Sequence, residues 1–168
     1  INLGDFRETY HGSRVRLPDL LQLILDETPV ERVRLSSIEP PDVTDELLRV
    51  MAQSQGRIAP FLHICLQSGC EATLKRMRRN YTASSYAAAV ENARAYMPSI
   101  ALGTDLIVGF PGETDDEFQT SYEFCERMGF AKMHVFRYSK REGTPAASAP
   151  NQIDPHIMAS RSKRMREL

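Results

Sequence analysis

The sequence lacks several features that would assign it to a specialised class of protein. Its 21 lysines and arginines nearly balance its 22 aspartates and glutamates, and the formal net charge of −1 excludes the global positive charge typical of a nucleic-acid binder. No apolar run approaches the roughly 20 residues that span a bilayer, and no signal peptide is visible, so we expect no membrane partner. No internal repeat or low-complexity segment stands out.

Cysteine is also scarce, with only Cys65, Cys70 and Cys125. An odd, sparse set does not indicate a disulfide framework and predicts a reducing, cytoplasmic location. A metal role for Cys65 and Cys70 is a minor alternative, because zinc and iron–sulfur sites need three or four ligands in tighter motifs. We therefore expect no metal ligands in this chain. Cys125 falls on an apolar helix face and is expected to be inert.

The 168 residues are enough for one domain, and the 42% of hydrophobic residues support a core. The chain begins with Ile1 rather than Met, and residues 1–5 resemble a strand end and loop whose strand is missing. We therefore expect a piece of a longer protein.

Apolar patterns typical of helices and strands alternate along the chain. Helices are predicted at 17–25, 44–51, 74–77, 82–97, 114–128 and 155–168. Strands are predicted at 33–38, 61–66, 101–108 and 133–138. Strict alternation of the two predicts an α/β protein with a parallel sheet.

The segment from Thr104 to Thr114 combines a buried strand, a Gly-Phe-Pro-Gly turn and an acidic helix N-terminus. Helix N-termini carry free amides and a partial positive charge, so such loops hold anionic or polar ligands. An ordinary strand-to-helix connection is the alternative, because glycine and proline punctuate most of these loops.

Polar residues gather at the predicted carboxyl ends of the strands, where ligands bind in parallel α/β proteins. They are Asn2, Asp5, Ser36, Ser37, Glu39, Gln67, Ser68, Thr104, Asp105, Tyr138 and Ser139. Each alone is more readily a loop cap, but together they favour a small-molecule cleft. His63 and His134 fall inside apolar strands and are predicted to be core histidines.

Two clusters of basic residues have two interpretations each. Lys75, Arg76, Arg78 and Arg79 form either a solvated helix face or a site for a carboxylate or phosphate. Arg161, Lys163, Arg164 and Arg166 are predicted to be solvated charges on the last helix, or to lead toward a nucleic-acid-binding module.

Five motifs in a fixed order then carry a family resemblance. They are Arg34–Pro40, His63–Gly69, Leu74–Thr82, Thr104–Thr114, and His134–Ser139 followed by Gly143-Thr144-Pro145. Together they closely resemble the radical S-adenosylmethionine methylthiotransferases over essentially the whole chain. The Ser-Ser-Ile-Glu-Pro form is most similar to the branch that acts on threonylcarbamoyl-adenosine in tRNA.

The resemblance implies a fold and an activity. The fold is a partial parallel (βα) barrel of the radical SAM type over residues 1–150, truncated at the N-terminal strand. Residues 151–168 would form a basic helix leading toward an RNA-binding domain. The full-length enzyme would add a methylthio group to a modified adenosine in tRNA. Alternatives are an enzyme acting on a ribosomal protein residue, or a non-catalytic fragment that binds a ligand or RNA.

The resemblance also implies cofactors and partners. The cofactors are S-adenosylmethionine and 4Fe–4S clusters, whose ligands are not in this chain. The partners are tRNA and a reductant protein. The family's Cys-x-x-x-Cys-x-x-Cys cluster loop is absent, and Cys65 and Cys70 stand where the family usually has Pro and Ser. We therefore expect the piece to be inactive alone, to bind S-adenosylmethionine weakly, and to self-associate through the edge where the first strand should pair.

Residue by residue, the resemblance implies contacts to S-adenosylmethionine but no catalytic residue. Asn2 faces the methionine part of the cofactor. Ser36, Ser37 and Glu39 match the end of the third strand, and Gln67 and Ser68 match the fourth-strand end near the ribose and methionyl groups. Arg79 matches a carboxylate clamp. Asp105 and the segment 108–113, which includes Val108 and Gly109, match the motif that packs on the adenine, and Tyr138 with Arg141 matches the end of the sixth strand.

Overall fold

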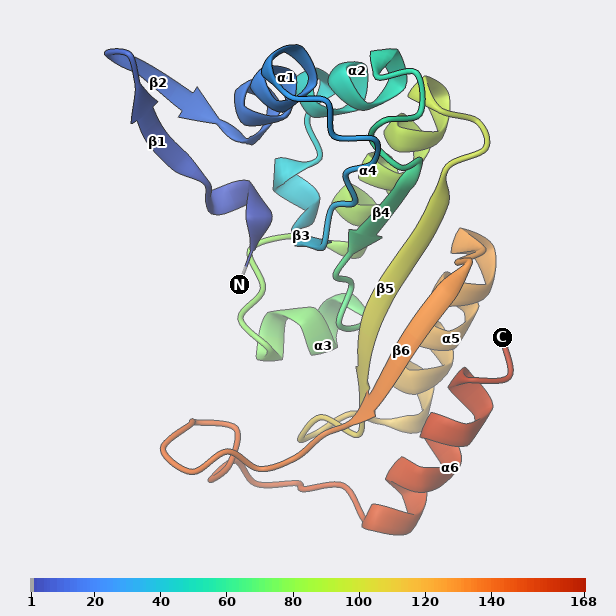
Figure 1. The fold of residues 1–168 in the computed structure, drawn as a ribbon. Coiled ribbons are helices and arrows are strands. Elements are labelled where there is room, and N and C mark those ends of the chain that lie inside the picture. The colour runs from blue at the N-terminus through green and yellow to red at the C-terminus, as the bar shows by residue number, and fades with distance from the viewer. Residues whose placement is uncertain (1) are drawn as a thin grey trace. The chain divides into compact units, whose positions relative to one another are not determined.

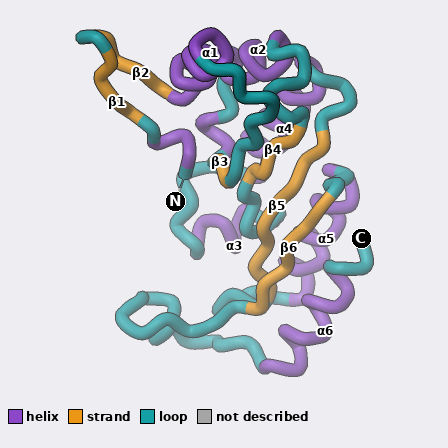
Figure 2. Tube along the Cα trace, viewed as in Figure 1, coloured by secondary structure: helices purple, strands orange, loops and turns teal. Residues whose placement is uncertain are grey.

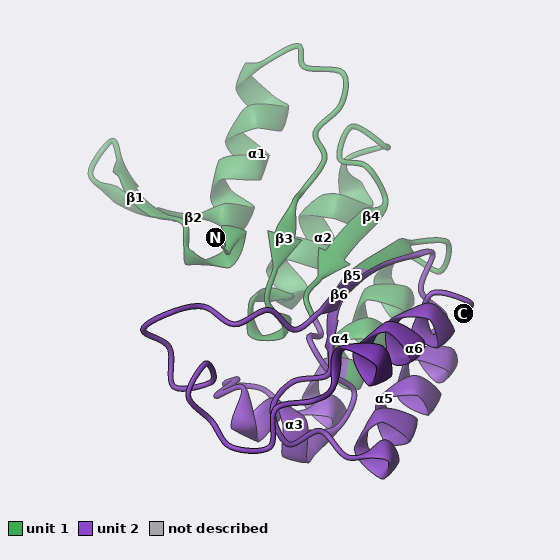
Figure 3. Ribbon diagram, turned by 90° about the horizontal axis from the view of Figure 1, so that it is seen from below, with its two compact units in different colours: residues 1–65, 87–103 green, residues 66–86, 104–168 purple. Residues whose placement is uncertain are grey.

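A computed structural model describes residues 2–168 of the protein. The chain divides into two compact units, coloured separately in Figure 3. The first contains residues 1–65 and 87–103, and the second contains residues 66–86 and 104–168. Strand β5 (Ala101–Val108) and helix α4 (Ala83–Tyr96) pass from one unit to the other.

The first unit begins with a short 3-10 helix, η1 (Leu3–Asp5), and an antiparallel hairpin of β1 (Arg7–Tyr10) and β2 (Ser13–Arg16). Its remaining elements are α1 (Leu17–Glu27), β3 (Ser37–Ile38), η2 (Pro40–Asp42), α2 (Asp45–Gln53) and β4 (Phe61–Ile64). Strand β4 pairs in parallel with β3 on one side and with the start of β5 on the other.

The second unit holds α3 (Glu71–Arg76), the rest of β5, α5 (Asp115–Met128), β6 (Lys132–Arg137) and α6 (Pro155–Met165). The strand order is β3-β4-β5-β6, and the sheet and helices can be followed in Figures 1 and 2. The predicted α/β class with a parallel sheet is confirmed. None of the described helices is long and apolar enough to cross a membrane.

Strands β4 and β5 have one buried face and one half-exposed face. In β4, Leu62 and Ile64 are fully buried while Phe61 and His63 are half-buried. In β5, the polar Asp105 and the apolar Ile107 are both half-buried and fall on the same side, two residues apart. The half-exposed face is therefore available for function, and it carries the polar residues of the strands.

The helix caps predicted from the sequence are present in the structure. Thr44 and Thr114 each accept a hydrogen bond from a first-turn amide, and Thr114 forms the predicted capping box with Glu117. Gly129 ends α5 in the left-handed conformation, as its position after Met128 predicts.

Three strand predictions need correction. The strand predicted at 33–38 is reduced to β3, and Val33 makes only an isolated bridge to Ile58. Strand β4 ends at Ile64 instead of residue 66, because Gln67 adopts a left-handed φ of 66°. In place of the predicted strand end, residues 3–5 form η1; Ile1 lies outside the described residues.

The β1–β2 hairpin was missed altogether. Its two turn residues, His11 and Gly12, have φ values of 49° and 80°, which suit a two-residue hairpin turn. The flanking Thr9, Tyr10 and Val15 are strand formers, so a signal was present but short.

Candidate functional site

A cavity of about 410 Å³ in the first unit and another of about 430 Å³ in the second are the candidates for ligand binding. The first cavity lies between the hairpin and α1 and is lined mainly by apolar side chains. The second lies at the ends of β5 and β6 and combines aromatic and polar side chains. Its lining residues are Gln67, Asp105, Ile107, Phe110, Phe136, Arg137, Tyr138, Ser139 and Arg141.

The second cavity lies where ligands bind in parallel α/β proteins, at the carboxyl ends of strands. Strand alternation directs Asp105 and Ile107 of β5 to one face. The backbone of Gln67 is hydrogen-bonded to β5: its N–H donates to the Asp105 carbonyl at 2.8 Å, and its carbonyl accepts from the Ile107 N–H at 2.9 Å. These two bonds hold Gln67 at the cavity wall although β4 has already ended.

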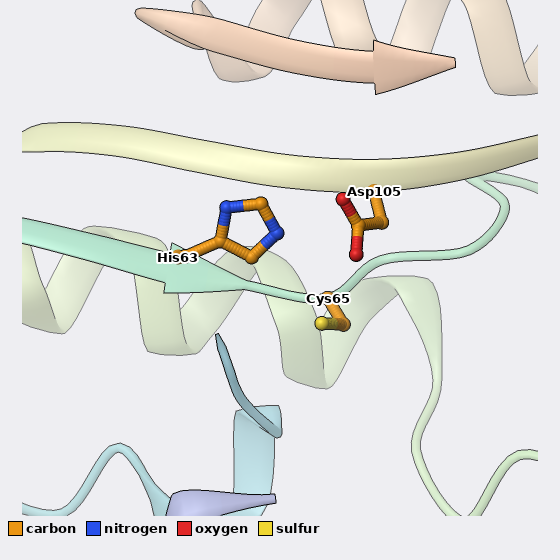
Figure 4. A group of neighbouring side chains, drawn as sticks. All are labelled: His63, Cys65 and Asp105. Atoms are coloured by element: carbon orange, nitrogen blue, oxygen red, sulfur yellow. The ribbon is translucent and has the colours of Figure 1, made fainter. Parts of the chain in front are cut away.

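Asp105, drawn in Figure 4, forms a polar pair with His134 of β6. The His134 Nδ1 lies 3.2 Å from the Asp105 Oδ1, and the two side chains are 43% and 24% exposed. The prediction that His134 is a core histidine is therefore wrong, because it lies on the open face of the sheet. A carboxylate in this position orients the imidazole ring.

Tyr138 is positioned by its backbone and by its ring. Its N–H donates to the Val108 carbonyl at 2.9 Å, and its ring packs edge-to-face on Phe110 with centroids 5.3 Å apart. The Tyr138 hydroxyl is buried and has no hydrogen-bond partner within residues 2–168. A buried polar group without a hydrogen-bond partner lowers the stability of the fold by about 1–3 kcal/mol, so a bound molecule that hydrogen-bonds this hydroxyl would be stabilised by it.

Two amides of the Gly-Phe-Pro-Gly loop are bonded within the protein, and the Gly112 N–H donates to the Asn151 carbonyl at 2.9 Å. The Gly109 N–H donates to the Glu113 Oε2 at 2.7 Å, and Glu113 is only 3% exposed. Gly109 has a φ of 74°, and a Cβ atom there would lie 2.2 Å from the Met158 Cγ. The sequence predicted that this loop offers amides to a ligand; at Gly109 that amide is taken by a carboxylate of the same loop.

Glu113 is in turn bound by helix α6. The Arg161 Nη1 donates to the Glu113 Oε2 at 2.7 Å and to the Glu113 carbonyl at 3.0 Å. Burial raises the pKa of Glu113, and the hydrogen bond from Gly109 and the charge of Arg161 oppose that rise. Arg161 is 6% exposed, so the prediction of a solvated charge at this position is wrong.

The N-terminus of α5 is also satisfied internally. The Glu117 carboxylate accepts from the Thr114 N–H at 3.1 Å and from the Arg76 Nη1 at 2.9 Å. The hydrogen bond from Arg76 lowers the pKa of Glu117. Arg76 from the basic cluster is therefore an ion-pair partner of α5, which neither of the two predicted interpretations included.

The other predicted residues of the second unit do not line the cavity. The Ser68 side chain is 1% exposed and accepts from the Cys70 N–H at 3.2 Å, which is a turn contact. Val108 is 2% exposed, and Arg79 is half-buried. The structure thus brings together Gln67, Asp105, Tyr138, Ser139 and Arg141 from the predicted residues.

Sequence reasoning did not single out Ile107, Phe136 and Arg137 as cavity residues. Ile107 and Phe136 each lie two positions from a polar residue that faces the cavity, so strand alternation would have identified them. Phe110 lies in the segment 108–113, which the resemblance matched to the adenine motif.

In the first unit, Asn2 is bound within the protein. Its Oδ1 accepts from the N–H groups of Gly4 and Glu39 at 3.1 and 3.0 Å, and its Nδ2 donates to the Asp42 Oδ2 at 2.7 Å. This side chain therefore ties η1 to the loop after β3. The predicted contacts of Asn2 and Glu39 with a cofactor stay predictions.

Ser36 is exposed, and Ser37 is half-buried opposite His63 in the β3–β4 pair. His63 belongs to β4, and Cys65 follows the end of that strand (Figure 4). The predicted roles of the two serines also stay predictions.

The comparisons with known proteins identify the family. The model of the radical SAM superfamily matches residues 10–125. The chain belongs to this superfamily. It is 44% identical over 136 residues to the threonylcarbamoyladenosine tRNA methylthiotransferase MtaB of Bacillus subtilis, which covers 81% of the chain and 30% of the relative. It is 36% identical over 167 residues to a tRNA-2-methylthio-N(6)-dimethylallyladenosine synthase of Ehrlichia chaffeensis, which covers 99% of the chain and 38% of the relative.

The chain thus spans about a third of the length of these curated relatives. Two solved structures share its fold at low identity. A cobalamin-dependent S-adenosylmethionine radical enzyme, OxsB, has a TM-score of 0.54 at 18% identity over 89% of this chain and 19% of its own. Methylornithine synthase has a TM-score of 0.53 at 11% identity over 92% of this chain and 54% of its own. The predicted partial barrel of the radical SAM type is confirmed.

The cysteines of this radical SAM chain do not fit an iron–sulfur cluster. The spacings between Cys65, Cys70 and Cys125 differ from Cys-x-x-x-Cys-x-x-Cys. Cys70 and Cys125 are buried in the second unit, and burial raises the pKa of the Cys125 thiol to about 12. Cluster ligands are thiolates, so a thiol that ionises only at such a pH is a poor ligand.

The cavity residues do fit part of S-adenosylmethionine. A volume of about 430 Å³ is in the range of small-molecule sites. Two aromatic rings, Phe110 and Tyr138, suit a planar base, while Gln67 and Asp105 offer amide and carboxylate groups to its polar edge or to a ribose.

Proposed function

We propose that this chain carries the S-adenosylmethionine-binding part of the barrel of a tRNA methylthiotransferase. The observation that supports the activity is the 44% identity to a tRNA methylthiotransferase over 81% of the chain. Among the substrates named for its relatives, threonylcarbamoyl-adenosine in tRNA is the one named for that methylthiotransferase, and the Ser-Ser-Ile-Glu-Pro motif favours the same substrate. We propose it as the substrate of the whole protein, in the cytoplasm.

The cavity of the second unit is the proposed site for the adenosine part of the cofactor. The Tyr138 hydroxyl would donate to the ligand, which would give this buried group a partner. The rings of Phe110 and Tyr138 would exclude water from one side of the base. The Gln67 side chain would hydrogen-bond the base or the ribose, and its backbone contacts with β5 keep it in place.

Asp105 and His134 would hold the ribose side of the cofactor. The carboxylate is an acceptor for ribose hydroxyls, and its contact with the imidazole limits its rotation. S-adenosylmethionine bound in this family supplies a carbon-centred radical. The residues described here bind and orient the cofactor, and the 4Fe–4S cluster would need ligands other than the three cysteines of this chain.

The activity is tested with the full-length protein. Anaerobic incubation with S-adenosylmethionine, a reductant protein or dithionite, and tRNA that carries threonylcarbamoyl-adenosine is expected to yield its methylthio derivative. Mass spectrometry of the digested nucleosides detects the product. Modification of dimethylallyladenosine instead would correct the substrate, and no modified nucleoside from either tRNA would contradict the proposed activity.

The site is tested by binding. Tyr138→Phe removes the buried hydroxyl, and we expect it to weaken S-adenosylmethionine binding about tenfold in calorimetry, as loss of one buried hydrogen bond predicts. Tyr122→Phe is the matched control, because Tyr122 lies on α5 and does not line the cavity. Equal affinities for the two variants would place the adenosine elsewhere.

A further inference from the structure

The β1–β2 hairpin is an element of the first unit that the proposed cofactor site does not use. It lies at the edge of that unit in two perpendicular views (Figures 1 and 3), with the first cavity between it and α1. All four residues of β1 are exposed. A two-residue turn with positive φ at His11 and Gly12 holds the strands in a fixed register, so the hairpin is preformed.

One face of the hairpin is basic. Arg7 lies directly opposite Arg16, and Arg14 lies opposite Thr9, so strand alternation puts the three arginines on the same face. The other face is anchored by Val15, which is 6% exposed. Two like charges opposite each other destabilise a strand pair, so this face is not explained by the stability of the hairpin itself.

The charges of these arginines differ in how far they are neutralised. The Arg16 Nη2 lies 3.0 Å from the Glu46 Oε2. The Arg7 Nη1 donates only to two backbone carbonyl oxygens at 2.6 Å, which leaves its charge in place. The Arg14 side chain makes no hydrogen bond or ion pair within the described residues 2–168. Arg16 also lies 4.0 Å from the Asp19 Oδ2, so it shares its charge with two carboxylates, whereas Arg7 and Arg14 have no carboxylate partner within the described residues.

The tip of the hairpin is aromatic. The Tyr10 side chain is 43% exposed, and its ring meets the His11 imidazole edge-to-face with centroids 4.2 Å apart. Tyr10 alternates with Arg7 along β1, so it falls on the Val15 side and also lines the first cavity; the tip carries the rings and the other face carries the arginines. Proteins bind single-stranded RNA with exposed aromatic rings, on which bases stack, and with guanidinium groups, which pair with phosphates.

We propose that this hairpin binds the tRNA substrate, an inference that rests on the proposed methylthiotransferase function. Arg7, Arg14 and Arg16 contact backbone phosphates, and the Tyr10–His11 pair stacks on an unpaired base. Arg14 and Arg16 are two residues apart on a strand and hence separated by about 7 Å, so they reach different phosphates. The fixed register means that little conformational entropy is lost on binding.

Binding of a fluorescent transcript of the substrate tRNA to the full-length protein tests this proposal. We expect Arg14→Glu to weaken binding about tenfold and to reduce the slope of log K against log salt by about 1. Tyr10→Ala is expected to weaken binding about tenfold with the salt slope unchanged, because stacking releases no counterions. Arg32→Glu is the matched control, since Arg32 is an exposed arginine of the same unit outside the hairpin, and it should change affinity less than twofold.

Steady-state methylthiolation separates the two proposals. The hairpin variants should raise KM for tRNA and leave kcat unchanged at saturating tRNA. A wild-type protein that neither binds nor modifies tRNA would contradict the proposed function. A wild-type protein that does both, with Arg14→Glu indistinguishable from Arg32→Glu, would overturn the role of the hairpin alone.

A second variant distinguishes the loss of an RNA contact from misfolding of the protein. Arg14→Ala adds no negative charge, and it should weaken binding about threefold with an unchanged melting temperature. Lost affinity that appears only together with a lowered melting temperature would overturn the proposal, because the effect would then be structural.

Discussion

The ion pair between Arg161 and Glu113 gives the sharpest stability prediction. The two side chains are 7% and 2% exposed, and the Arg161 Nη1 lies 2.7 Å from the Glu113 Oε2. Removal of one partner leaves an uncompensated buried charge, which typically costs 3–5 kcal/mol. We expect Arg161→Met to lower the free energy of unfolding by about 3–5 kcal/mol, which for a chain of this size lowers the melting temperature by roughly 6–20 °C.

Urea denaturation followed by circular dichroism measures this loss in Arg161→Met, Glu113→Gln and the double variant. Since the two residues are in direct contact, the double variant should be more stable than the sum of the single losses predicts, by about 1–3 kcal/mol. Arg16→Met is the control, because Arg16 and Glu46 are 48% and 51% exposed and such a pair contributes about 0–1 kcal/mol.

Two results would refute this reasoning. Arg161→Met could lose no more stability than Arg16→Met, which would mean that water reaches the pair and screens it. Alternatively, additive single losses would show that Arg161 stabilises the protein through its other contacts, with the Glu113 carbonyl, Asp115 and the Phe118 ring, and not through the Glu113 carboxylate.

Three further predictions concern acid stability, thiol reactivity and the loop. The hydrogen bond from Arg76 lowers the pKa of the Glu117 carboxyl. The contribution of Glu117 to stability is therefore present above the ordinary pKa of 4.5 and is lost as the pH falls through the lowered pKa. Glu117→Gln should make the free energy of unfolding depend less on pH between pH 6 and pH 3. Mass spectrometry after alkylation of the native protein at pH 8 should find the half-buried Cys65 labelled and Cys125 unlabelled, because burial raises the pKa of Cys125 to about 12. Gly109→Ala should lower the melting temperature more than Gly112→Ala, since both have positive φ but only the first places a Cβ against another side chain at 2.2 Å.

Local sequence signals explain which parts of the fold were predictable. Strand β5 was predicted with its observed bounds, because eight consecutive residues end at a Gly-Phe-Pro-Gly turn. Thr44 and Thr114 located the starts of two helices because a capping hydrogen bond spans only three residues and is therefore a local signal. The short β1–β2 hairpin offered only four residues per strand and no apolar alternation, so its pattern was too weak to detect.

The candidate site was predictable where strand geometry applies. Gln67, Asp105 and Tyr138 follow or end strands, and the rule that ligands bind at carboxyl ends selected them. The same rule selected Ser68 and Asn2, whose side chains are bound by nearby amides and whose cofactor contacts stay predictions. A list of polar residues does not reveal whether each one already has a partner in the folded chain.

Long-range pairs were beyond sequence reasoning altogether. Nothing in the pattern around Arg161 distinguishes it from the exposed basic residues beside it, yet it binds a carboxylate 48 residues away. That carboxylate, Glu113, holds the Gly109 amide, and the loop it organises carries Phe110 to the cavity wall. Helix α6 therefore supports the candidate site, although it lies outside residues 10–125, which the superfamily model matches. Because the buried charge of Glu113 is balanced from α6, loss of Arg161 should disturb the cavity as well as the stability of the fold.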